Sequence, residues 1–167
     1  ILLAQNYTGY KNLMKLVTAG YLEGFYYRPR IDIDLLREYN EGLICMSACL
    51  KGEVPERMLR GDYEGAKKAA ITFSEIFPNR YYLEIQNHGI PEEEANLKNM
   101  KKLSQELNLP LVCTNDAHYA RKEHWEAHDI HICLGTGKER SDPNRLRYAT
   151  PEFYFKSQDE MHNLFKA

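Results

Sequence analysis

The chain has 167 residues, of which 43% are hydrophobic and 28% charged, and its formal net charge is -2. This size and composition indicate one globular domain with a real core, and no apolar run approaches the ~20 residues of a membrane span. The charge balance excludes a generally basic protein, so any contact with nucleic acid must be local, through a basic patch or a metal.

The chain opens inside an apolar run, residues 1–5, which predicts a strand. It has no initiator Met, so we expect an internal piece of a longer protein whose functional site is shared with other segments. A helix over residues 7–22 is expected to follow, with Asn6 or Thr8 as its cap.

Strand and helix patterns alternate along the rest of the chain. Further helices are expected at 34–39, 54–59, 63–77, 91–107 and 122–134, and a last one is capped by Ser157 with Glu160 three residues on. Further strands are expected at 43–48, 80–86, 111–113 and 152–156. This alternation predicts an α/β fold of about four parallel βα units, which form either a small open sheet or an arc of a barrel.

Asp116 and His118 follow the apolar run at 111–113, which Pro110 introduces. Side chains alternate along a strand, so both are expected on one face at its C-terminal end, where α/β active sites assemble. A carboxylate and an imidazole side by side suit a metal ion. The alternative is a carboxylate that caps the next helix beside a packed histidine, and the spacing alone does not decide between them.

Cysteines lie in and just after the strand expected at 43–48. Period two puts Cys45 and Cys49 on one face. A thiolate at Cys49, at the C-terminal end of the strand, is a soft ligand suited to zinc, whereas Cys45 is expected to be a small buried hydrophobe. The alternative for Cys49 is likewise a small buried hydrophobe. The four cysteines form no CxxC pair, which fits a reducing cytoplasm.

A polar face runs along the strand expected at 80–86 and just beyond it. Glu84, Gln86 and His88 share this face, while Leu83 and Ile85 share the other. A polar face on a central strand would line a wet cavity. The alternative is an edge strand with one solvated side.

Three histidines, His124, His128 and His131, have the spacing of a helical zinc site. The HExxH context is absent, and apolar neighbours indicate a packed helix. We therefore expect His128 to be a hydrogen-bonded residue of the helix rather than a metal ligand.

Basic residues cluster in two loops. Arg28 and Arg30 flank Pro29 after two tyrosines, and the second cluster consists of Lys138, Arg140, Arg145 and Arg147. Arginine forks match phosphate oxygens, so either loop could hold a phosphate. The alternative is a solvated loop, or one whose cations bind neighbouring carboxylates.

Five longer phrases carry a family resemblance. They are GFYYRPRID (24–32), EGLICMSACLKGEVP (41–55), YYLEIQNHG (81–89), LPLVCTNDAHY (109–119) and TGKERSDPNRLR (136–147). In order and spacing they closely resemble the PHP (polymerase and histidinol phosphatase) domain of the bacterial DNA polymerase III alpha subunit family. The resemblance runs the whole length of the chain, so residues 1–167 are expected to form part of one PHP domain.

The resemblance implies a distorted seven-stranded α/β barrel, of which this chain would be the C-terminal arc. It also implies a cluster of divalent metals, zinc first and manganese or magnesium as alternatives. Of the family's metal ligands, Cys49, Asp116 and His118 are present, and the others belong to segments upstream of the stretch that matches Ile1. From the residues themselves we add Arg28, Arg30 and His88 as groups that could orient a phosphate.

The resemblance further implies a replicative DNA polymerase whose PHP domain is a metal-dependent phosphoesterase with 3′–5′ exonuclease activity. Its expected partners are DNA, the other domains of the polymerase and replisome subunits. One alternative is a non-catalytic module that stabilises the polymerase and docks a proofreading subunit, and another is a free-standing phosphatase. We expect residues 1–167 alone to be inactive, because most metal ligands are missing.

Overall fold

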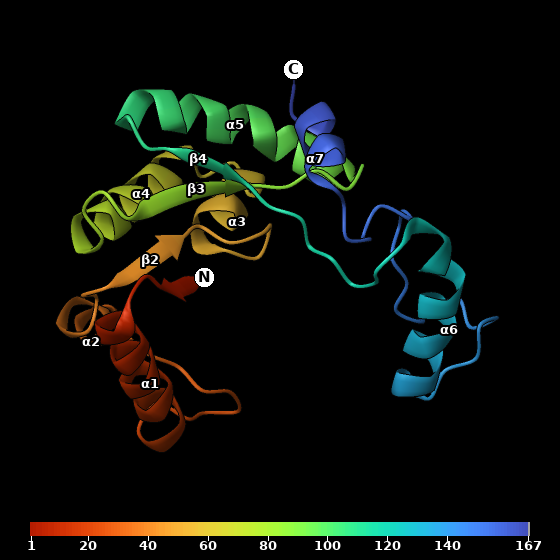
Figure 1. Cartoon of the computed structure of the whole chain (residues 1–167), viewed down its shortest axis with the longest axis horizontal. Helices are drawn as coiled ribbons and strands as arrows, with labels where there is room; N and C mark the ends of the chain where they lie inside the picture. Colours follow the sequence, from red (N-terminus) through yellow and green to blue (C-terminus); the bar gives the residue numbers. More distant parts are fainter. Residues whose placement is uncertain (167) are drawn as a thin grey trace.

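The computed structural model describes residues 1–166, and Figure 1 shows them as an open arc with α1 at one tip and α6 at the other. The strands are β1 (Leu2–Ala4), β2 (Leu43–Met46), β3 (Tyr81–Ile85) and β4 (Leu111–Cys113). The helices are α1 (Tyr7–Leu22), α2 (Ile33–Glu38), α3 (Glu53–Leu59), α4 (Tyr63–Ile76), α5 (Pro91–Leu107), α6 (Trp125–Thr136) and α7 (Gln158–Leu164), with a 3-10 turn η1 (Lys122–His124) before α6. None of the helices in this part of the chain combines the length and apolar character needed to cross a bilayer.

Local sequence signals set the ends of several helices. The Asn6 side chain accepts the Gly9 amide at 2.9 Å and caps α1, as predicted. The predicted capping box at α7 is also present, because Ser157 and Glu160 bond each other's backbone amides. Helix α5 begins with Pro91 and ends where Asn108 adopts a left-handed conformation.

The four strands form one sheet in the order β1-β2-β3-β4. Strands β2, β3 and β4 are parallel, as expected, but β1 pairs antiparallel to β2, so the expectation of parallel units throughout was wrong. The reason lies in the connection. Helices α1 and α2 return the chain to the end of the sheet that it left, and the Gln5 amide bonds the Gly42 carbonyl at 2.8 Å.

The core lies between the sheet and helices α3, α4 and α5, which Figure 1 shows grouped around β2, β3 and β4. Its largest fully buried side chains include Phe77, Tyr81, Leu83, Met100 and Leu103. Cys45 is only 5% exposed, which confirms its role as a small buried hydrophobe, and burial raises the pKa of its thiol to about 11.

Beyond β4 the chain leaves the sheet and runs to α6 (Figure 1). The strand expected at 152–156 does not form. Tyr154 instead makes a single bridge to Tyr119, and the Phe153 carbonyl accepts the His118 amide at 2.8 Å. This short backbone contact has no third strand beside it, so it fastens the last segment to the residues that follow β4 without extending the sheet.

Candidate metal centre

Asp116 and His118 lie in the irregular segment directly after β4. Asp116 Oδ2 and His118 Nε2 are 3.1 Å apart, so the structure brings the predicted pair together. When two ligand atoms each lie about 2.1 Å from one tetrahedral zinc ion, the separation between the two atoms is close to this value of 3.1 Å. The side chains are 47% and 34% exposed, so solvent reaches both residues. Their donor chemistry and spacing therefore fit a metal.

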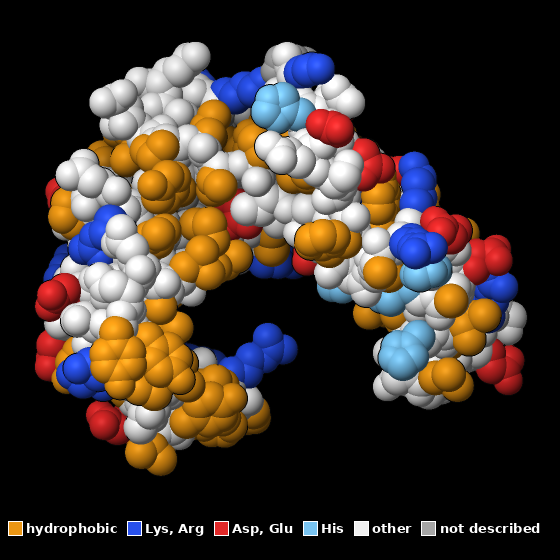
Figure 2. All heavy atoms as spheres, viewed as in Figure 1, with side chains coloured by type: hydrophobic (Ala, Val, Ile, Leu, Met, Phe, Trp, Pro, Cys, Tyr) orange, Lys and Arg blue, Asp and Glu red, His pale blue; other side chains and the backbone are white. Residues whose placement is uncertain are grey.

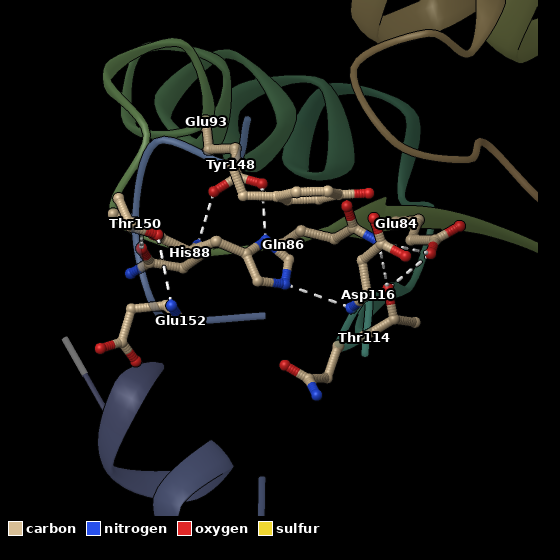
Figure 3. Close-up of polar contacts among 12 residues, drawn as sticks. Glu84, Gln86, His88, Glu93, Thr114, Asp116, Tyr148, Thr150 and Glu152 are labelled. Atoms are coloured by element: carbon tan, nitrogen blue, oxygen red, sulfur yellow. Dashed lines mark hydrogen bonds and ion pairs between the residues drawn. The ribbon is translucent and has the colours of Figure 1, made fainter. Parts of the chain in front are cut away.

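A buried histidine holds the Asp116 backbone in place. His88 Nε2 accepts the Asp116 amide at 3.2 Å, and His88 Nδ1 lies 2.8 Å from Glu93 Oε1 (Figure 3). Because a backbone amide can only donate, Nε2 must be the acceptor and Nδ1 carries the proton that is donated to Glu93. Glu93 also accepts the His88 amide through its other oxygen, at 2.5 Å. This chain of bonds connects α5 to the segment after β4.

His88 is fully buried, and its ring stacks on Phe153 with centroids 4.4 Å apart. Thr150 donates its hydroxyl to the His88 carbonyl at 2.5 Å. Both ring nitrogens and both ring faces are therefore engaged or covered, and neither nitrogen is free for a phosphate. In this arrangement His88 positions Asp116, which differs from the phosphate contact expected from the sequence.

Aromatic rings surround His118. The Tyr148 hydroxyl lies 3.1 Å from both of its ring nitrogens, and the His128 ring lies 5.9 Å away, centroid to centroid. Burial and then the Asp116 carboxylate raise the pKa of Tyr148, while burial and then the charge of His118 lower the pKa of His128. His128 packs against rings, including Tyr119 at 5.0 Å, and its side chain makes no hydrogen bond within residues 1–166, which differs from our expectation.

The polar face of β3 is buried and hydrogen-bonded. β3 lies between β2 and β4, so the edge-strand alternative is wrong. Glu84 is 3% exposed and accepts bonds from Thr114 at 2.5 Å and Gln86 at 3.4 Å (Figure 3). Its second carboxylate oxygen is buried without a partner. These contacts join the ends of β3 and β4 just before Asp116.

Cys49 lies after β2, beyond Ala48, whose φ of 65° turns the chain away from the strand. It is partly buried and lines a small pocket with Gln86 and Glu93. Cys49 follows β2 and Asp116 follows β4, and β3 separates these two strands, whose axes are therefore about 10 Å apart within the sheet. Within residues 1–166, no three His, Cys, Asp or Glu side chains are grouped closely enough to hold one ion. The structure thus joins Asp116 to His118 but not to Cys49.

The two basic loops differ. Arg28 and Arg30 lie in the loop between α1 and α2, and the structure does not bring them into contact with Asp116 or His118. In the second loop Arg145 forms a two-pronged ion pair with Asp129 of α6, at 2.5 and 2.8 Å. The carboxylate-binding alternative is confirmed for that loop.

Sequence reasoning missed Glu93 and Tyr148. Glu93 is one of three glutamates in the first turn of α5, but it alone falls on the buried stripe that continues through Asn96, Met100 and Leu103. Helical periodicity could therefore have singled it out. Tyr148 lies in an irregular segment 30 residues from His118, and no local pattern marks it.

Comparison with known proteins places the chain in a family. The PHP domain model matches residues 1–88, more than half of the chain. The chain belongs to the PHP domain family. PHP domains are generally metal-dependent, in keeping with the donor chemistry of the Asp116–His118 pair.

Relatives extend the similarity beyond the residues that the PHP model matches. The chain is 52% identical to the DNA polymerase III subunit alpha of Borreliella burgdorferi over 165 residues, and 47% identical to that of Treponema pallidum over 166. It is 41% identical to the corresponding subunit of Thermus aquaticus over 160 residues. These matches cover 96–99% of this PHP chain but only 13–14% of each relative.

Proposed function

We propose that this chain is the PHP region of a bacterial DNA polymerase III alpha subunit, and that the region is a metal-dependent phosphoesterase that removes nucleotides from the 3′ end of DNA. Relatives with that subunit name match nearly the whole chain, which supports the parent protein, a DNA-directed DNA polymerase. The same matches support assigning residues 1–167 to one PHP domain, an arc of its barrel.

The observation that carries the phosphoesterase proposal is the Asp116–His118 pair, 3.1 Å apart and exposed to solvent. A buried support, Glu93 through His88 to the Asp116 amide, fixes one member of the pair. Divalent metals, when bound, lower the pKa of a coordinated water to about 7 and polarise a phosphoryl oxygen.

Each residue then has a definite role. Asp116 and His118 hold metal, and Cys49, across β3, serves another ion of the cluster. The sulfur and imidazole donors favour zinc, while the carboxylate also suits manganese or magnesium. The remaining ligands come from other segments of the domain, so residues 1–167 alone are inactive. Arg28 and Arg30 bind phosphate.

The test uses the full-length polypeptide and a single-stranded oligonucleotide labelled at its 5′ end. Asp116→Ala should reduce 3′–5′ nuclease activity by at least about a hundredfold, as should a chelator added to the wild-type protein. DNA synthesis by the variant should be unchanged. Asp34→Ala is the matched control, because that carboxylate is 89% exposed on α2 and forms a surface ion pair with Arg37.

Full nuclease activity in the Asp116→Ala protein would overturn the proposal. A wild-type protein with no chelator-sensitive nuclease, but with a measurable complex with a separate proofreading subunit, would instead favour the non-catalytic module. Hydrolysis of small phosphoesters without action on DNA would favour a phosphatase.

A further inference from the structure

One surface of the molecule exposes aromatic rings in unusual number. Figure 2 shows hydrophobic side chains gathered over α1 and the loop that follows it. The rings come from both elements, and their exposed fractions are 52–82% for Tyr7, Tyr10, Tyr21, Phe25, Tyr26 and Tyr27. We call α1 together with residues 25–30 the aromatic–basic surface. The opposite face of α1, through Leu16 and Gly20, is buried, so these rings are turned away from the core.

The same surface carries cations without acidic partners. Residues 7–30 contain Lys11, Lys15, Arg28 and Arg30 but a single acid, Glu23, in a chain whose net charge is -2. In the described part of the chain none of the four cations forms an ion pair. Three lie over rings instead, at 5.2 Å for Lys11 on Tyr7, 4.7 Å for Lys15 on Tyr39 and 5.2 Å for Arg30 on Tyr26.

The loop at 25–30 packs closely on the end of α1. A Cβ on Gly24 would lie 2.0 Å from the Arg30 carbonyl oxygen, so the returning loop packs directly on the end of α1. The Tyr26 amide bonds the Arg28 carbonyl at 3.1 Å and closes a tight turn. Tyr27 at its tip has a φ of 58°, which is strained for a bulky residue, yet its ring is 82% exposed. The fold thus maintains strain that presents one ring to solvent.

We infer that the aromatic–basic surface binds single-stranded DNA. Exposed rings on which bases stack, interleaved with cations that contact phosphates, are the two parts of a sequence-tolerant single-strand site. A polynucleotide supplies bases for the exposed ring faces and phosphates for the cations that have no acidic partner. The choice of DNA over other polynucleotides rests on the proposed function, in which the protein acts on DNA strands.

The test localises binding within the full-length polypeptide. A single-stranded oligonucleotide with 5-iododeoxyuridine at every third position is crosslinked by ultraviolet light in excess EDTA, so that no cleavage occurs. Crosslinked peptides are then identified by mass spectrometry. We expect crosslinks within residues 7–30, centred on Tyr26 and Tyr27, and fewer with duplex DNA.

Substitutions separate the two parts of the surface. The double variant Tyr26→Ala/Tyr27→Ala should reduce crosslinking in this segment by about tenfold or more, while Tyr27→Phe keeps the ring and should retain it. Arg28→Gln/Arg30→Gln should lower the salt dependence of that crosslinking by a slope of about 1.4, two phosphate contacts at about 0.7 each. Lys138→Gln/Arg140→Gln, in the other basic loop, is the matched control.

Crosslinks that fall only outside residues 7–30, or that persist unchanged in the Tyr26→Ala/Tyr27→Ala variant, would overturn the inference. So would protection of Tyr27 from tyrosine-modifying reagents in DNA-free protein, because another polypeptide segment or a second copy would then cover the surface. The readout requires no catalysis, so loss of these crosslinks is distinguishable from failure of the Asp116→Ala nuclease test.

Discussion

The two basic loops contain similar residues but have opposite electrostatic surroundings. In the aromatic–basic loop, residues 25–30, neither arginine has a carboxylate partner among residues 1–166, and Arg30 lies over the ring of Tyr26. In the loop at 138–147, which we call the ion-paired loop, Arg145 binds Asp129 and Lys138 binds Asp142. Arginine composition therefore does not identify a phosphate site. The supply of acids in the loop and on the neighbouring helix decides whether the cations remain available.

The loops also differ in what holds them. The ion-paired loop is anchored through charge, because the side chains of Arg145 and Asp129 are only 5% and 11% exposed. The aromatic–basic loop is anchored by close backbone packing on Gly24 and by the turn at Tyr27. Removal of charge and acid should therefore affect the ion-paired loop, whereas a steric change at Gly24 should affect the aromatic–basic loop.

The largest effect is expected from removing the charge that anchors the ion-paired loop. Arg145→Met removes the two-pronged partner of the poorly exposed Asp129 carboxylate and leaves it Arg140, whose Nε lies 3.5 Å away, which is strongly unfavourable. Amide hydrogen exchange across residues 138–147 should accelerate by at least about tenfold. Arg28→Met is the control and should leave exchange in residues 25–30 nearly unchanged. Equal effects in both loops would remove the contrast between them.

A steric change should affect the aromatic–basic loop instead. Gly24→Ala places a methyl group 2.0 Å from the Arg30 carbonyl oxygen and should destabilise the protein by about 1–3 kcal/mol in urea unfolding. The matched control is Gly135→Ala in α6, where nothing lies within 4 Å of the new methyl group. That substitution should stabilise the protein by about 0.5–1 kcal/mol. A harmless Gly24→Ala would show that the loop is not held by this contact.

The smallest effect is expected from acid. The hydrogen bond from Arg145, followed by the charges of Arg145 and Arg140, lowers the pKa of Asp129. Its stabilising contribution is therefore present above the ordinary Asp pKa of about 4 and is lost as pH falls through the lower folded-state value. Amide hydrogen exchange across residues 138–147 should accelerate in that range. In the Asp129→Asn variant this acid-induced change should be absent. In the wild-type protein, DNA crosslinking to residues 25–30 should not change in parallel with it.

Elements with strong local signals were predictable from the sequence. The bounds of α1, α5 and β4 agree with the expected ranges because apolar periodicity, a capping residue or a proline marks each of them. The direction of β1 was not predictable in this way. The direction depends on where α1 and α2 return the chain to the sheet, and the sequence of β1 contains no information about that position.

The candidate site likewise contains residues that the local sequence predicts and residues whose positions depend on tertiary structure. Strand alternation and the family resemblance pointed to Asp116 and His118, and the structure places them together. Cys49 lies across β3, since strand order rather than local sequence sets that separation. The buried support by His88 and Glu93 depends on a contact between a loop and α5, so the sequence suggested a phosphate contact for His88 instead.

The central claim is that Asp116 and His118 hold metal, and metal content measures this most directly. The full-length protein, purified without chelators, should contain two or three divalent ions per chain by inductively coupled plasma mass spectrometry. Asp116→Ala/His118→Ala should lose at least one ion per chain, while Asp34→Ala, on the exposed surface of α2, should lose none. An unchanged metal content in the double variant would contradict the account.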